Sequence, residues 1–391
     1  MADRQEVSIH FPKVQNFTCT SCGKCCQTDW RVKVHDAEAR VIEGLRVYGE
    51  LKRQGYTPLH IVDDHLQLNR RENLDCHFLE EQRCLIHQES GPSAKPAPCR
   101  LFPFQLVGTP DGYFASLSFS CPAVISGDGD RVEQQVEDLA LAIQEAPHFF
   151  PENLSTNSHV TIVEGVKLPW GAYLAYEATI LKLVEESTHL SDTLLHVAAV
   201  IADSITGHKA PDYQINPTPQ SKTLQENLKQ LLPMLTSITI AHLEEFENLE
   251  RRQEVIGGLA GNVGFESNLL NSYALPFSQI KPLDQIAVSI LKRYVFGTIF
   301  GKTLTTGPSF LSRLLYLAVS LQVFTYYLGC KKALSQSKHF SQSEVEWCFD
   351  LLENEARHHQ DILTPVFLEW ENDLLGFGRQ LNEPQPLNPI L

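Results

Sequence analysis

Cysteine spacing constrains this chain more than any other feature. Eight of the ten cysteines lie between positions 19 and 121, and they begin with the run Cys19-x2-Cys22-x2-Cys25-Cys26. Two residues between cysteines is the spacing at which a tight turn directs both sulfurs at one ion, and Gly23 permits the backbone to turn there. The remaining members of this set are Cys76, Cys84, Cys99 and Cys121. We therefore predict that residues 1–126 form a small, loop-rich domain in which all eight bind a metal or an iron–sulfur centre.

Disulfide bonding is the competing explanation for clustered cysteines, and it needs an oxidising compartment. The first residues, MADRQEVSIHF, are polar and contain no apolar run that resembles a secretion signal. We therefore expect a cytoplasmic protein whose thiols are metal ligands. Cys330 and Cys348 stand apart in helical sequence, where a cysteine is usually a small core residue.

The number of cysteines leaves the type of centre open. Eight thiolates suffice for two four-thiolate sites, or for one cluster and one zinc, since both zinc and a [4Fe–4S] cube take four ligands. The C-x2-C-x2-C rhythm also occurs in ferredoxins and favours the cluster over zinc. Because neighbouring side chains diverge, Cys25 and Cys26 are not expected to share one mononuclear ion. His77 or His87 could replace a sulfur, although an ordinary surface role or a hydrogen-bonding role beside the site is favoured for each.

Apolar periodicity predicts an α+β protein. In the first domain, residues 104–107 and 113–120 flank a turn and form a hairpin that delivers Cys121, and 36–54 forms a helix. The glycine-rich segment 125–130 marks a boundary, and a mainly α-helical domain, 127–391, follows. An exposed connector is expected near 216–221 and a poorly ordered tail at 376–391. The predicted helices are 131–145, 170–186, 191–205, 223–256, 283–300, 310–328 and 342–360.

Charge and hydropathy exclude two classes of partner. Nearly all of the net charge of −15 lies beyond residue 126. An acidic helical half argues against nucleic acid or an anionic membrane. It would suit a basic protein surface, but a solvated acidic face that aids solubility explains it better. The most membrane-like stretch, 311–330, contains Arg313 and Gln322, so a buried helix is expected there.

The cysteine motifs resemble those of a known family. The run CxxCxxCC, then Cys76-His-Phe-Leu with Cys84-Leu-Ile-His, then Pro98-Cys99-Arg100-Leu-Phe102-Pro103, is similar to the cysteine-cluster family described as zinc- or iron-chelating. Within it, the chain looks most like the flagellin lysine-N-methylase branch, in which a helical region follows the cysteine domain. The close match covers residues 19–121. Seven cysteines match the pattern directly, and Cys121 matches as the later cysteine.

This resemblance implies an iron–sulfur cluster and an S-adenosylmethionine-dependent lysine N-methyltransferase, whose partner is a protein with surface lysines. It supplies no catalytic residue. The nearest approach to a methyl-donor loop is the glycine-rich segment 257–264, in which Gly258, Gly261 and Asn262 would line a pocket. It follows a charged helix rather than a strand, so a helix end and a turn explain it better. Likewise, 297–307 is predicted to be a break between helices.

Two weaker alternatives complete the predictions. His358 and His359 follow an acidic helix, with Glu355 four positions before His359, but an exposed helix explains them better than a metal site. The alternative function is a non-enzymatic metal-binding or electron-transfer module, because an iron–sulfur centre moves electrons without further protein chemistry. The size of the helical domain favours a substrate, partner or cofactor of its own.

Overall fold

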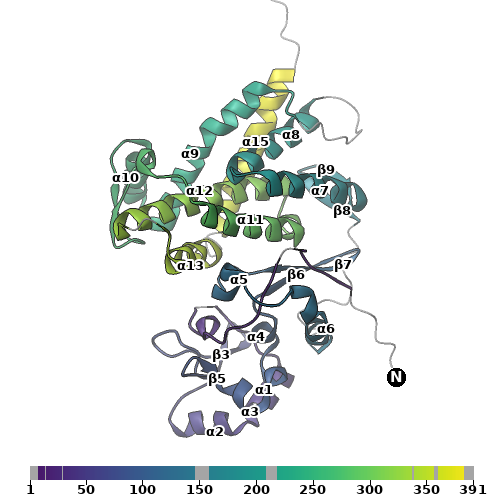
Figure 1. The fold of residues 1–391 in the computed structure, drawn as a ribbon, viewed down its shortest axis with the longest axis vertical. Helices are drawn as coiled ribbons and strands as arrows, with labels where there is room; N and C mark the ends of the chain where they lie inside the picture. The colour runs from purple at the N-terminus through teal and green to yellow at the C-terminus, as the bar shows by residue number, and fades with distance from the viewer. Residues whose placement is uncertain are drawn as a thin grey trace, which may run out of the picture. The chain divides into compact units, whose positions relative to one another are not determined.

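The computed structural model describes residues 8–145, 158–207, 218–336, 339–355 and 360–382, except positions 14 and 29. The chain divides into two compact units, Met1–Thr156 and Asn157–Leu391 (Figure 1). The first unit combines short strands, short helices and loops, and the second is mainly helical, so the α+β class is confirmed. The predicted domain boundary at 126/127 lies earlier in the sequence than this division, because residues shortly after it are hydrogen-bonded to the N-terminal segment. Residues 130–135 are hydrogen-bonded to the N-terminal segment: the Phe17 N–H donates to the Asp130 carbonyl (2.8 Å) and the Gln135 amide to the Phe17 carbonyl (2.8 Å).

The first unit is built from short elements. Its helices are α1 (Asp36–Glu43), α2 (Arg46–Arg53), α3 (Leu85–Ser90), α4 (Ala97–Leu101), α5 (Pro122–Ser126) and α6 (Val136–Glu145), with 3₁₀ turns at Lys24–Cys26, Pro92–Ala94 and Val132–Gln135. Its strands are β1 (Ile9–His10), β2 (Leu59–Val62), β3 (His65–Leu68), β4 (Leu79–Glu80), β5 (Arg83–Cys84), β6 (Phe104–Thr109) and β7 (Gly112–Leu117). The single helix predicted at 36–54 is wrong: Gly44 caps the end of α1, and the extended backbone of Leu45 separates it from α2.

A three-stranded sheet, ordered β1-β7-β6, supports the later cysteines. β6 and β7 form the predicted antiparallel hairpin, which pairs Phe104 with Leu117 and Thr109 with Gly112. Gly112 has φ 119°, and a Cβ there would lie 2.6 Å from the Ser8 carbonyl oxygen. Glycine is therefore required where β1 runs beside β7. All six β7 residues are buried, and the chain leaves this strand toward Cys121.

The second unit is a helical assembly with two hairpins. Its helices are α7 (Trp170–Glu186), α8 (Leu190–Thr206), α9 (Lys222–Glu244), α10 (Leu249–Ala260), α11 (Gln285–Phe300), α12 (Phe310–Ser335), α13 (Gln342–Asp350) and α15 (Gln360–Asn382), with a π turn at Leu351–Glu355 and 3₁₀ turns at Phe277–Gln279 and Thr303–Thr305. The hairpins are β8 (His159–Val163) with β9 (Val166–Pro169), and β10 (Phe265–Ser267) with β11 (Ser272–Ala274).

Helix α12 is the core of this unit, and it packs against α8, α9, α13 and α15 (Figure 1). Within the described ranges, it is the one helix long and apolar enough to cross a membrane, and 78% of its most apolar window is buried inside the protein. This burial confirms the buried helix predicted over 311–330. Cys330 and Cys348 are both fully buried, as expected for core residues.

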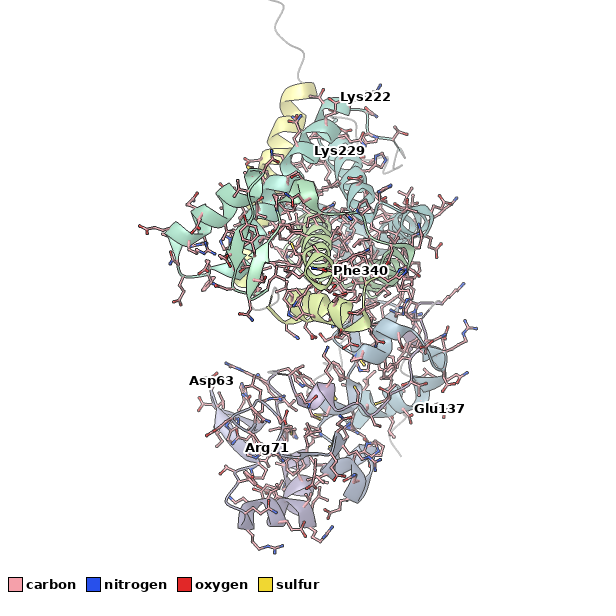
Figure 2. All side chains as sticks on the ribbon, turned by 60° about the vertical axis from the view of Figure 1, so that its left-hand side comes forward. Asp63, Arg71, Glu137, Lys222, Lys229 and Phe340 are labelled. Carbon is pink, nitrogen blue, oxygen red and sulfur yellow. The ribbon has the colours of Figure 1, made fainter. Side chains whose placement is uncertain are left out.

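Several helix ends differ from the predicted positions. Pro233 lies inside α9 without ending it. The predicted helix 223–256 is interrupted at residues 245–248, and the last of these, Asn248, caps α10. Helix α8 begins at Leu190, after His189, which is one residue before the predicted start at 191. The exposed Lys222 and Lys229 project from α9 (Figure 2). Helix α15 continues to Asn382, so the tail predicted from 376 is wrong over its first seven residues, and 383–391 lie outside the described residues.

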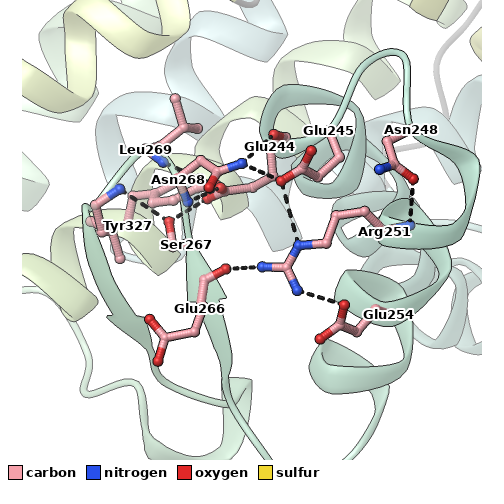
Figure 3. A network of polar contacts seen from close by, with 11 residues as sticks. Glu244, Glu245, Asn248, Arg251, Glu254, Glu266, Ser267, Asn268, Leu269 and Tyr327 are labelled. Atoms are coloured by element: carbon pink, nitrogen blue, oxygen red, sulfur yellow. Dashed lines mark hydrogen bonds and ion pairs between the residues drawn. The ribbon is translucent and has the colours of Figure 1, made fainter.

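A buried carboxylate joins α9, the β10–β11 hairpin and α12 (Figure 3). Glu244 accepts hydrogen bonds from the Ser267 hydroxyl (2.5 Å), the backbone N–H groups of Asn268 (2.8 Å) and Leu269 (3.2 Å), and the Tyr327 hydroxyl (2.6 Å). Hydrogen bonds to a charged acceptor in a buried place are stronger than neutral ones. This network therefore fixes the hairpin on the helices.

Candidate metal centre

Five of the eight clustered cysteines line one small cavity in the first unit: Cys25, Cys26, Cys76, Cys84 and Cys99. They come from four separate places in the sequence: the 3₁₀ turn Lys24–Cys26, the loop before β4, the end of β5, and α4. The Cys76 N–H donates to the Cys26 carbonyl (2.8 Å), which holds the first cysteine motif against the second. Cys84 ends the β4–β5 hairpin, where it pairs with Leu79.

Apolar side chains form most of the cavity wall, and these walls continue the hydrophobic core of the unit. Phe78 and Ile86 are each 1% exposed, and Val32 is 3% exposed. Trp30 completes one side, and its indole N–H donates to the Cys25 carbonyl (2.6 Å). Such a setting excludes water and strengthens electrostatic interactions between thiolates and a cation.

Two cationic side chains, Arg70 and Lys95, also line the cavity. Arg70 donates to the carbonyl oxygens of Cys26 (3.2 Å), Trp30 (2.9 Å) and Leu74 (2.8 Å), so its guanidinium group is held in place. A four-thiolate site around a divalent ion carries a net negative charge, which nearby cations stabilise. Arg70 and Lys95 were not predicted as part of the site, because no motif in the sequence distinguishes them beyond their positions a few residues before Cys76 and Cys99.

The adjacent cysteines lie close enough for a hydrogen bond between their thiols. The sulfurs of Cys25 and Cys26 lie 4.0 Å apart. A hydrogen bond from Cys26 lowers the pKa of Cys25 to about 6, with a further contribution from the charge of Lys95, and the same bond raises the pKa of Cys26. Cys25 is therefore a thiolate at neutral pH. The expectation that these two side chains diverge is wrong, because the 3₁₀ turn directs both sulfurs into one cavity.

Two further thiols of the cavity, those of Cys76 and Cys99, keep their protons when no metal is bound. Burial raises the pKa of Cys76 to about 11, and it raises the pKa of Cys99 well above its ordinary value. A bound cation would displace these protons, because only thiolates ligate metals.

The remaining predicted ligands lie elsewhere. Cys19, Cys22 and Cys121 are not among the residues that line the cavity, nor are His77 and His87. The His77 ring instead contacts Tyr56, with 5.0 Å between the ring centroids. Burial lowers the pKa of both histidines, so neither gains a proton at neutral pH.

The donor set fits a thiolate-binding ion. Within the described ranges, no group of three or more His, Cys, Asp or Glu side chains has the spacing of a ready-made metal site. The five sulfurs surround a common cavity instead, so they would move toward an ion as it binds. Thiolates in this number, with no carboxylate in the wall, suit zinc or iron and not magnesium or calcium.

The residues singled out for other sites stand apart from this centre. Gly258 lies inside α10, and Gly261 ends that helix, as the helix explanation of the segment predicts. The predicted break at 297–307 is confirmed between α11 and α12. His358 and His359 lie outside the described residues.

Comparison with protein families identifies the cysteine segment. Residues 18–122 match the family model CxxCxxCC, described as "Putative zinc- or iron-chelating domain". The resemblance predicted from the cysteine motifs is thus confirmed for this segment, and likeness to the flagellin lysine-N-methylase branch stays a prediction. Comparison with curated proteins and with solved structures gave no match.

Proposed function

We propose that this protein chelates a resident zinc or iron in the cavity formed by Cys25, Cys26, Cys76, Cys84 and Cys99. The observation that carries the proposal is the convergence of five thiols, from four places in the chain, on one cavity that also contains Lys95 and Arg70. The description of the matching family supports the same two metals. When bound, such a metal would crosslink loops that have little regular structure, and iron would add one-electron chemistry.

A single ion fits the geometry better than a cluster. With metal–sulfur bonds of about 2.3 Å, two thiolates on one tetrahedral ion stand about 3.8 Å apart, and the sulfurs of Cys25 and Cys26 lie 4.0 Å apart. A [4Fe–4S] cube holds each thiolate on a different iron and therefore separates them further. The ferredoxin-like C-x2-C-x2-C rhythm keeps the cluster as the second candidate.

Metal analysis of protein purified without oxygen tests both candidates. We expect stoichiometric zinc or iron without sulfide for a single ion, and iron with equal sulfide and a brown colour for a cluster. Cys76→Ser and Cys99→Ser should each lose the metal, and Cys348→Ala, a buried cysteine of the other unit, should keep it. Retention of full metal content in both serine variants would overturn the proposal.

For the helical unit, we propose the activity that the resemblance implies, S-adenosylmethionine-dependent methylation of protein lysines in the cytoplasm. The acidity of residues beyond 126 supports a lysine-bearing protein as substrate. Calorimetric titration of the metal-loaded protein with S-adenosylmethionine is the test. Absence of binding would leave the alternative, a metal-binding or electron-transfer module without methyl transfer.

A further inference from the structure

Helices α8, α9, α12 and α15 of the second unit lie together (Figure 1), and their side chains leave between them a pocket of about 400 Å³, which we call the helical pocket. The cavity at the cysteines is far smaller, about 30 Å³. Protein interiors seldom leave a void much larger than a water molecule, whereas sites for small molecules measure about 300–1,000 Å³. The helical pocket therefore has the size of a small-molecule site.

The walls of the helical pocket are aliphatic. Eight of its twelve lining residues are leucine or valine. Several of them, among them Leu228 of α9, Leu315 of α12 and Leu374 of α15, are at most 5% exposed and belong to the core of the unit. Because leucine and valine side chains offer no hydrogen bonds, a buried polar group would lose its hydration there without replacement. The part of a ligand that these walls hold is therefore a hydrocarbon.

Polar side chains of the helical pocket lie where it opens to solvent. Gln230 and Asp373 are exposed, and Asn227 and Trp370 are half-buried. Among the lining residues that the structure describes, Asp373 alone carries a charge, and that charge is negative. A ligand that fits this arrangement has a polar end at the mouth and a hydrocarbon end inside.

Trp370 and Asp373 together favour a positive charge on the polar end. They lie three positions apart on α15, and residues with this spacing share one face of a helix. The face of an indole ring attracts an ammonium group, and a carboxylate forms a charge-assisted hydrogen bond with it. A ligand carboxylate would instead face Asp373, with no lysine, arginine or histidine among the described lining residues to offset the repulsion.

We propose that the helical pocket binds a small cationic amphiphile, an aliphatic chain that ends in an amine. The chain lies between the leucines of α9, α12 and α15, and the ammonium group lies at the mouth beside Trp370 and Asp373. The pocket belongs to the second unit and needs no metal, so this inference goes beyond the metal site and is independent of it. S-adenosylmethionine, whose two ends are polar, does not match the aliphatic walls.

Displacement of the fluorescent apolar probe N-phenyl-1-naphthylamine from the full, metal-loaded chain tests the inference. The probe should brighten as it enters the helical pocket. Decylamine and decanoic acid, each below its critical micelle concentration, are then compared as competitors. Because the two share one hydrocarbon chain, the difference between them reports the charged group. We expect decylamine to displace the probe at a concentration about tenfold lower than decanoic acid.

Three variants make the test specific to the helical pocket. Leu231→Trp enlarges a half-buried lining side chain and should abolish probe binding. Leu249→Trp makes the same exchange on α10, where Leu249 is 68% exposed, and is the matched control that should bind as the wild type does. Asp373→Asn changes an exposed side chain, so it keeps the test valid where Leu231→Trp fails to fold. It should reduce the preference for decylamine to about twofold or less.

The outcomes that contradict the inference are distinct from failure of the metal site. Absence of brightening in the wild type, or equal probe binding by Leu231→Trp and Leu249→Trp, would overturn the site. Decanoic acid that competes as well as decylamine, or a preference that Asp373→Asn leaves unchanged, would overturn the cationic ligand. Displacement of the probe by S-adenosylmethionine would assign the helical pocket to the methyl donor, which also overturns the inference.

Discussion

Raising the pH from 7.5 to 8.5 is expected to strengthen zinc binding at the five-cysteine cavity by about 1000-fold. At pH 7.5, Cys25, with a pKa of about 6, is already a thiolate. Cys26, Cys76 and Cys99 have raised pKa values and still carry protons. If these four ligate the ion, binding releases about three protons, so the logarithm of the affinity rises by about three for each pH unit. This corresponds to about 4 kcal/mol per pH unit.

Replacing Cys19, Cys22 and Cys121 by serine isolates the cavity for this measurement, because these three cysteines do not line it. Competition with a chromophoric zinc chelator, corrected for the chelator's own protonation, would give the affinity between pH 7 and pH 9. Calorimetry at pH 7.5 in two buffers of different ionisation enthalpy would count the protons independently, with about three expected per zinc. Below pH 6 the slope should steepen toward four, as Cys25 also becomes protonated. A slope of one or less in both measurements would refute the assignment of these four thiols as ligands.

The remaining predictions concern stability, measured by urea unfolding followed through helical circular dichroism. Lys302 and Glu177 form an ion pair (2.5 Å) in which both side chains are at most 5% exposed. Lys302→Met should therefore cost about 3–5 kcal/mol by leaving a buried charge, and adding Glu177→Gln should recover most of the loss; equal stability of the single and double variants would contradict this. Glu244→Gln should cost about 2–3 kcal/mol and Tyr327→Phe about 1 kcal/mol, because the buried carboxylate accepts several hydrogen bonds. Gly129→Ala should destabilise the first unit by about 1–3 kcal/mol, since φ is 109° and the added Cβ meets Thr18 at 2.6 Å; an unchanged unfolding midpoint would contradict this.

Much of the secondary structure follows from local sequence. Helix α7 spans the predicted 170–186, and the β6–β7 hairpin forms around the predicted turn, because apolar periodicity and turn residues act over a few positions. The errors occur where a neighbour decides the outcome. The single helix predicted over 223–256 ends instead near Glu244, whose carboxylate is held by a hairpin and by α12.

The cysteine pattern by itself identified the segment, residues 18–122, that matches a family described as zinc- or iron-chelating, since short spacings between thiols act within one turn of backbone. The grouping of those cysteines was decided only by the tertiary structure. Cys25 meets Cys76, Cys84 and Cys99 in one cavity, whereas Cys19, Cys22 and Cys121 do not line it. Such groupings depend on how loops separated by tens of residues pack together, and local spacing carries no information about that packing.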